Sequence, residues 1–167
     1  MRIIVIILLC FSAHFVKAQK LPNFDAIKLE SAADCKPAEP HALAAANYLF
    51  ETPYSKNDVY RLRSLQFIIQ WMSATPDYKF SLSGMDQKFL KGNDDLLGMY
   101  MGAMTRYVLG TQGASDDEKT VRLNAIGMVL DYTDNPTNNL KPTKNLRKLS
   151  EARAKGELEK ALESDAR

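Results

Sequence analysis

Five segments of this chain combine a helix-capping residue with apolar residues that recur every three or four positions. They cover about residues 34–52, 57–72, 94–109, 115–132 and 144–163. Apolar side chains at that spacing fall on one face of an α-helix, and the caps satisfy amide groups that a helix end leaves unpaired. Strand signals are few, the main one being the alternation of Tyr78, Phe80 and Leu82. The pattern predicts an all-α domain with five main helices in an irregular bundle.

The helix at 57–72 has the widest apolar surface and is predicted to be central to the core. Asn57 or Ser55 is its expected cap, with Asp58 in the first turn. Its apolar repeat comprises Leu62, Leu65, Ile69 and Met72, and further apolar residues widen the stripe: Val59, Tyr60, Phe67, Ile68 and Trp71. The first helix is expected to be capped by Asp34 and ended by Pro53. The last helix has a narrow apolar stripe, so we expect it on the surface.

The first 18 residues have the layout of a secretory signal peptide. A basic start at Arg2 precedes the apolar run 3–11, and Val16-Lys17-Ala18 supplies a cleavage site. We therefore expect an exported protein that begins at Gln19, periplasmic or secreted. No later apolar run approaches the ~20 residues of a membrane helix, so the mature form is expected to have no transmembrane span.

Removal of the signal peptide leaves no net charge. The whole chain has 22 Lys and Arg against 20 Asp and Glu, and Arg2 and Lys17 are the charged residues of the signal peptide, so 20 of each sign remain. A neutral mature chain indicates no nucleic-acid partner, because no overall field attracts a polyanion. Cys35 is the only cysteine outside the signal peptide. We interpret it as a buried residue at a helix start, with a reactive or intermolecular thiol as the alternative.

The mature chain fits one domain. Residues 19–33 are interpreted as an extended N-terminal arm, and 34–167 as a single helical domain. Its first four helices form two hairpins, followed by a C-terminal surface helix. Residues 47–52 resemble residues 106–111 at a separation of 59, which leaves open whether the two hairpins are a duplication or similar by coincidence.

The mature chain lacks most of the residues that known catalytic and metal-binding motifs require. His41 is the only histidine of the mature chain, which excludes a site with several histidine ligands. The acidic stretch from Asp131 lacks the glycine and glutamate of a calcium loop, having Pro136 and Pro142 at those positions. Acidic pairs such as Asp94-Asp95 lie at expected helix starts, where carboxylates favour the helix dipole. We predict no metal and no cofactor.

Two features leave a choice between packing and binding. Gly98 and Gly102 form a Gly-x-x-x-Gly in the helix at 94–109, and we interpret it as a close helix–helix crossing. We expect the aromatic residues to be buried in the core. Any of them that are exposed are candidates to line a groove for a peptide or glycan. These ligand-binding candidates are Trp71, Tyr78, Phe80, Tyr100 and Tyr107.

The stretches Phe67–Tyr78 and Gly92–Tyr107 resemble a group of small exported helical proteins of Bacteroidetes-type bacteria. The resemblance covers most of the mature chain and brings no known activity or site residue with it. It implies a Gram-negative envelope setting. The leading hypothesis is a non-enzymatic exported module that binds an envelope or secreted protein, or a small ligand. The alternative hypothesis is a small hydrolase or lyase that uses carboxylates in an inter-helical cleft.

Overall fold

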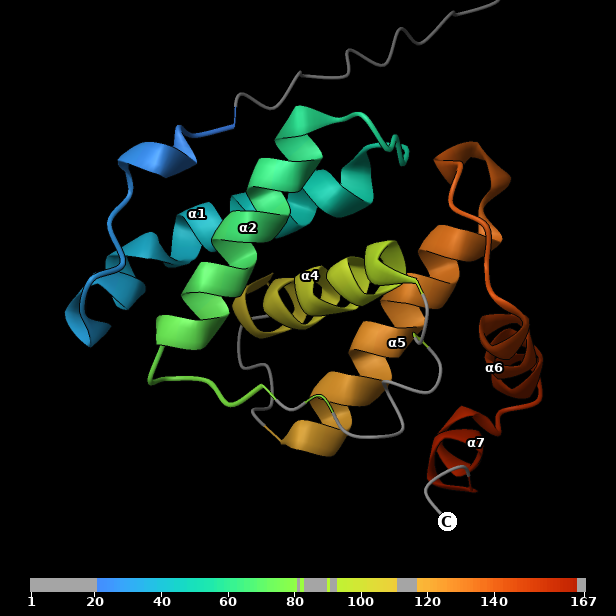
Figure 1. Cartoon of the computed structure of the whole chain (residues 1–167). Coiled ribbons are helices and arrows are strands. Elements are labelled where there is room, and N and C mark those ends of the chain that lie inside the picture. Colours follow the sequence, from blue (N-terminus) through green and yellow to red (C-terminus); the bar gives the residue numbers. More distant parts are fainter. Residues whose placement is uncertain (1–20, 81, 83–89, 91–92, 111–116, 165–167) are drawn as a thin grey trace, which may run out of the picture.

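The computed structural model describes residues 21–80, 82, 90, 93–110 and 117–164, which form an all-α structure (Figure 1). Helices α1 and α2 pack together as one hairpin, α4 and α5 pack as a second, and α1 also packs on α4. The predicted fold class is therefore confirmed. The elements are η1 (Phe24–Ala26), α1 (Ala32–Glu51), α2 (Val59–Ala74), α4 (Asp94–Gly110), α5 (Glu118–Asp134), η2 (Pro136–Asn138), α6 (Lys144–Ala154) and α7 (Leu158–Ser164).

Small side chains bring α1 and α4 close together and close to α2. The core-facing side of α1 is lined by fully buried alanines, among them Ala42, Ala45 and Ala46. Opposite them, a Cβ atom on Gly102 would lie 2.7 Å from Leu49 Cδ1, and one on Gly98 would lie 2.7 Å from Leu65 Cδ2. No side chain fits there without movement of its neighbour. The glycine pair thus serves the close helix crossing that the sequence predicts.

The caps of the first two helices differ from the predicted ones. Ser31, not Asp34, precedes α1; the Asp34 carboxylate accepts hydrogen bonds of 2.8 Å from the hydroxyl and backbone N–H of Ser31. These bonds lower the pKa of Asp34. Asp58, not Asn57 or Ser55, caps α2 by accepting from the N–H groups of Tyr60 and Arg61. A carboxylate thus lies at the start of each helix, in the first turn of α1 and at the cap of α2, where the helix dipole also favours it.

Helix α5 is capped by Asp117, whose carboxylate accepts from the N–H of Thr120 at 2.9 Å. Ser115, the first residue of the predicted segment 115–132, lies outside the described residues. So do residues 81, 83–89, 91 and 92. Tyr78, Phe80 and Leu82 lie in irregular chain rather than in a strand.

The predicted extended arm carries a short helical turn and is anchored to the core. Residues 24–26 form η1, and Phe24 is 8% exposed. Its ring stacks on Phe67 of α2 at a centroid distance of 4.8 Å. Burial of this large aromatic side chain against α2 holds the segment on the core. The segment from Leu21 onward is therefore part of the packed structure.

The predicted last helix is two helices. The N–H of Gly156 donates to Arg153 O at 2.9 Å and that of Glu157 to Ala152 O at 2.8 Å, which is the Schellman pattern at a helix end. Gly156 has φ of +73°, a conformation that glycine adopts without strain. The chain turns there, and α6 and α7 lie beside α5, on the side of the molecule away from α1 and α2 (Figure 1).

Candidate binding face on helix α2

Helix α2 is rotated so that polar residues face the core and part of its apolar repeat faces outward. Arg61 and Ser64 are buried together with Phe67, Ile68 and Trp71. Two long-range hydrogen-bonded anchors, one near each end of α2, account for this rotation. Both connect an α2 side chain to backbone carbonyls of α1 or the residue that follows it.

The first anchor is the guanidinium of Arg61, which extends from α2 to the end of α1. Its Nη2 donates to Leu49 O at 3.0 Å and to Thr52 O at 2.9 Å. The last carbonyls of a helix have no partner within the helix and carry its negative partial charge, so a buried cation is favoured there. Nη2 also donates to the hydroxyl of Tyr132 at 3.1 Å, which brings α5 to the same point. Arg61 thus joins the ends of three helices.

The same guanidinium lies against two tyrosine rings. Its Cζ is 5.6 Å from the ring centroid of Tyr54 and 5.9 Å from that of Tyr132. No Asp or Glu among the described residues forms an ion pair with it. Carbonyl oxygens and aromatic faces therefore stabilise this buried charge in place of a carboxylate.

The second anchor is Trp71, near the other end of α2. Its Nε1 donates to Cys35 O at 3.1 Å near the start of α1, and its side chain is fully buried. Cys35 itself is buried, and its thiol contacts Ser31 O at 3.7 Å. Burial raises the pKa of this thiol above its ordinary value, which disfavours the reactive thiolate. The geometry of Cys35 matches the interpretation of a buried helix-start residue.

Two of the four residues of the apolar repeat predicted to face the core are therefore directed outward. Leu62 is 56% and Ile69 41% exposed, and Leu65 and Met72 between them are half-buried. Val59 and Tyr60 at the start of the helix are exposed as well. We call the four residues Leu62, Leu65, Ile69 and Met72 the α2 stripe. Their spacing of three, four and three residues places them in one row along the helix.

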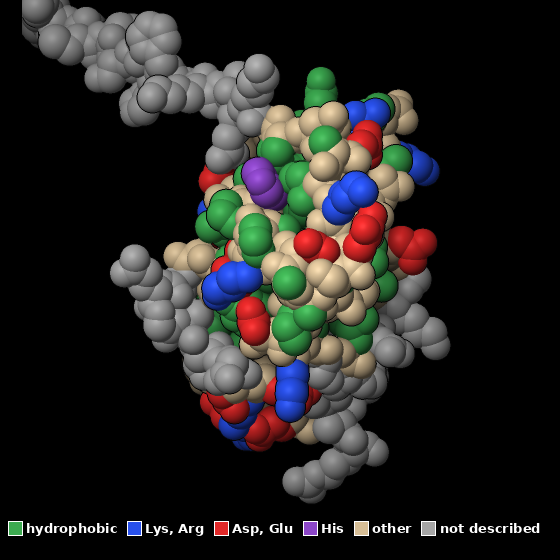
Figure 2. All heavy atoms as spheres, turned by 90° about the vertical axis from the view of Figure 1, so that its left-hand side faces the viewer, with side chains coloured by type: hydrophobic (Ala, Val, Ile, Leu, Met, Phe, Trp, Pro, Cys, Tyr) green, Lys and Arg blue, Asp and Glu red, His purple; other side chains and the backbone are tan. Residues whose placement is uncertain are grey.

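The polar side of the same outward face carries amides and one paired cation. Gln66 and Gln70 are exposed beside the α2 stripe. Arg63 pairs with Asp25 of the arm at 4.0 Å, and these residues line a cavity of about 270 Å³ with Phe24 and Phe67. Figure 2 shows the side of the molecule that bears the arm, where hydrophobic side chains reach the surface between charged ones of both signs. The α2 stripe is uncharged, whereas its surroundings are polar.

The five aromatic ligand-binding candidates do not form a groove together. Trp71 and Tyr100 are fully buried, so neither ring offers a surface to a ligand in this structure. Tyr78 and Phe80 are half-buried and pack on Trp71, with centroids 5.6 and 5.8 Å from it. Tyr107 is partly buried on α4, against the core. The default expectation of burial describes these rings better than a shared binding surface.

Four carboxylates of the described residues line cavities, each a separate one. Asp95 lines a cavity of about 30 Å³ between α2 and α4, large enough for water-sized molecules. It accepts a hydrogen bond of 2.7 Å from the Tyr54 hydroxyl; burial and this bond raise the pKa of Tyr54 to about 12. Asp25, Asp131 and Asp134 each line a different cavity. No group of three or more His, Cys, Asp or Glu among the described residues is arranged to hold a metal ion.

Sequence reasoning missed Arg61, whose position in the core decides which face of α2 is free. A signal was present, because an arginine within an otherwise apolar helix near the end of a preceding helix can cap that helix.

Comparison with protein-family models, with curated proteins and with solved structures gave no match in any of the three. The resemblance to small exported bacterial proteins thus stays a prediction. Within the described ranges, no helix has the length and apolarity needed to cross a bilayer.

Proposed function

We propose that this chain is an exported, non-enzymatic module that binds a partner protein of the cell envelope through the α2 stripe. The observation that carries this proposal is the exposure of Leu62 and Ile69 in the middle of a helix that is anchored rigidly on its other side. Exposed apolar rows on a preformed helix are surfaces that partner proteins cover. The first 18 residues support the export part of the proposal.

The partner that best fits this surface is an amphipathic helix. A row with spacing of three, four and three residues matches the spacing of apolar residues on a facing helix, so side chains of the two rows can interlock. The row carries no charge, so it suits the apolar face of such a helix, and polar residues border it as they border the apolar centre of an interface. A rigid surface also loses little conformational freedom on binding.

The test compares two double variants of the mature protein. Leu62→Ser with Ile69→Ser removes apolar surface, whereas Gln66→Ser with Gln70→Ser changes neighbouring exposed positions and serves as the control. A photo-crosslinking residue at position 62 first identifies the partner in the native envelope fraction, and its affinity is then measured with purified proteins. We expect the first variant to weaken binding about tenfold or more, because buried apolar anchors dominate interface energies. The control should bind as the parent does.

Three results would contradict the proposal. One is equal binding by both variants, and another is crosslinking from position 151 on α6 but not from position 62. The third is a concentration-dependent dimer of the purified protein that the first variant abolishes, which would identify the stripe as a contact between two copies. Cell fractionation tests the location, since a protein retained in the cytoplasm with Met1 intact would exclude export.

The alternative hypothesis of a carboxylate-dependent hydrolase or lyase requires two carboxylates that face one cavity. Each of the four cavities lined by Asp25, Asp95, Asp131 or Asp134 has that single carboxylate in its lining. Asp131 and Asp134 are in addition paired with Arg153. The described geometry therefore gives this hypothesis no specific support.

A further inference from the structure

The segment 135–150 concentrates positive charge, although the predicted mature form has a net charge of zero. It contains four basic residues and no Asp or Glu. Lys141, Lys144, Arg147 and Lys148 are all exposed. Within the described part of the chain, none of the four forms an ion pair or a side-chain hydrogen bond. The first turn of α6 holds no acidic residue that would offset them.

This arrangement is unfavourable for the isolated protein. Lys144, Arg147 and Lys148 lie in the first half of α6, next to its positive end, where cations are disfavoured. They also repel one another at neighbouring positions on the same helix. Such a cluster is stabilised when an anion binds to it, because each cation then gains an opposite charge.

A cavity lies beside these cations. It has a volume of about 500 Å³ and lies between the end of α5, the turn η2 and the start of α6. Lys141 and Arg147 form part of its lining, and Pro136, Leu140 and Pro142 contribute apolar surface. A volume of roughly 300–1,000 Å³ with apolar walls and a few polar groups is typical of small-molecule sites.

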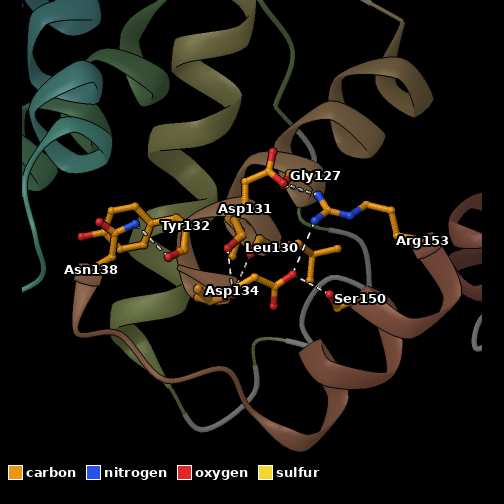
Figure 3. Close-up of polar contacts among 10 residues, drawn as sticks. Gly127, Leu130, Asp131, Tyr132, Asp134, Asn138, Ser150 and Arg153 are labelled. Atoms are coloured by element: carbon orange, nitrogen blue, oxygen red, sulfur yellow. Dashed lines mark hydrogen bonds and ion pairs between the residues drawn. The ribbon is translucent and has the colours of Figure 1, made fainter. Parts of the chain in front are cut away.

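One acid, Asp134, also lines the cavity, but its carboxylate is already paired with groups of α6. Its Oδ2 accepts from the Ser150 hydroxyl at 2.5 Å and pairs with Arg153 Nη2 at 3.4 Å. Arg153 also binds Asp131 Oδ1 at 2.7 Å and donates to Gly127 O at 3.1 Å (Figure 3). These contacts fasten α6 to α5 and direct the Asp134 carboxylate toward α6. Lys141 and Arg147 therefore leave the cavity with a positive character.

We propose that this cavity binds an organic phosphate. Lys141 and Arg147 would contact the phosphate group, and the apolar walls would receive the organic part. A guanidinium matches phosphate oxygens with parallel hydrogen bonds, and an ammonium adds a point charge, so this pair suits a dianion better than a single carboxylate. Lys144 and Lys148 raise the local potential that attracts it. This site is separate from the α2 stripe and does not depend on the proposed function.

The test uses phenyl phosphate as the probe, with phenol and inorganic phosphate as its two halves. Backbone amide shifts of the mature protein are followed by nuclear magnetic resonance during titration. We expect shifts confined to residues 133–148 and tighter binding of phenyl phosphate than of either half. Lys141→Gln with Arg147→Gln should weaken binding about tenfold or more, as loss of charged hydrogen bonds predicts. The control is Lys155→Gln with Lys160→Gln, which removes the same charge from exposed positions of the same C-terminal segment.

Vesicles distinguish the two sources of an organic phosphate. Binding to phosphatidylglycerol but not phosphatidylcholine vesicles, lost in the Lys141 and Arg147 variant only, would identify a lipid headgroup. Binding of phenyl phosphate without vesicle binding would indicate a soluble ligand, and both results support the site. Equal loss in the control variant would overturn the proposal, as would shifts elsewhere in the chain. A poly-glutamate peptide that binds this segment when phenyl phosphate does not would assign it to an acidic protein instead.

Discussion

The Nε of Arg106 donates a hydrogen bond of 2.9 Å to Oδ1 of Asn47, across 59 residues of sequence. These are the two positions that the weak internal repeat aligns. If two similar hairpins are related by a two-fold axis, equivalent residues near that axis meet each other. The neighbouring contacts run in opposite directions along the two helices, as a two-fold axis requires, since Gly110 lies near Leu43 and Gly102 near Leu49. This geometry agrees with a duplicated hairpin, which remains a prediction.

The Asn47–Arg106 bond should contribute measurably to stability. In a double-mutant cycle with Asn47→Ala and Arg106→Ala, we expect a coupling of about 0.5–1.5 kcal/mol in the free energy of unfolding. The comparison is a cycle with Glu51→Ala, whose carboxylate lies 3.7 Å from Arg106 and is half exposed. That pair should couple more weakly, at about 0–1 kcal/mol. Urea denaturation measures both, and a stronger coupling to Glu51 would contradict this interpretation of the contact.

Replacement of Trp71 should destabilise the protein severely. Trp71→Ala removes a fully buried ring and its bond to Cys35 O, and we expect a loss of about 3–5 kcal/mol. Trp71→Phe retains much of the ring but leaves that carbonyl without its donor, so its loss should be smaller, near ~1–3 kcal/mol. Chemical denaturation separates the two. Unchanged stability of Trp71→Ala with loss of the partner would instead make Trp71 a binding residue.

Arg61 should be hard to replace although no acid among the described residues pairs with it. Arg61→Met keeps the length of the side chain but leaves Leu49 O without its side-chain donor and removes one of the two donors to Thr52 O, so we expect a loss of about 2–4 kcal/mol. Arg61→Lys restores one charge without the planar geometry, and its stability should fall between those of the parent and Arg61→Met. A thermal melt of each variant gives the order. An increase in stability for Arg61→Met would show that burial of the charge costs more than its bonds return.

Arg61 and Trp71 also show where sequence reasoning reaches its limit. Helix positions followed from caps and prolines, because these act within a few residues: α4 begins at the predicted Asp94, and α1 ends before Pro53 as expected. The rotation of α2 did not follow, because the apolar repeat alone favours Leu62 and Ile69 inside. The contacts that decide it join α2 to carbonyls of α1 and Thr52, nine to 36 residues away. The arginine within an apolar helix was the one local sign of the first contact, and the contact between Trp71 and Cys35 left none.

The break between α6 and α7 is a different case, since its signal was local. Gly156 follows Lys155 at the end of α6, which is the sequence pattern of a glycine-terminated helix. The apolar residues Leu158 and Leu162 continue the spacing of the preceding helix and concealed the break. The basic cluster of 135–150 was concealed in another way, because a total charge of only +2 says nothing about how the charges are distributed.

Alkaline pH should destabilise the protein through Tyr54. Its folded pKa is about 12, raised by burial and by the hydrogen bond to Asp95, against an ordinary value of 10.0. A raised pKa means that the unfolded chain releases the proton first, so the contribution is complete below about pH 10 and is lost as pH rises toward about 12. Burial also raises the pKa of Tyr48 and Tyr132. Tyr54→Phe should flatten the fall in unfolding free energy between about pH 10 and 12; an unchanged slope would contradict this assignment.

Three glycine-to-alanine substitutions in helix interiors should rank by the space beside each Cα. A Cβ added at Gly127 would meet no atom within 4 Å, so Gly127→Ala should gain about 1 kcal/mol from helix propensity. Gly98→Ala meets Leu65 at 2.7 Å, but Leu65 is half-buried and can turn toward solvent, so its effect should be near zero. Gly102→Ala meets the fully buried Leu49 at 2.7 Å, where overpacking costs about 1–3 kcal/mol. Unfolding free energies in the order Gly127→Ala, Gly98→Ala, Gly102→Ala, from most to least stable, are therefore expected. A Gly102→Ala variant as stable as Gly127→Ala would show that α1 and α4 are not as closely packed as the structure has them.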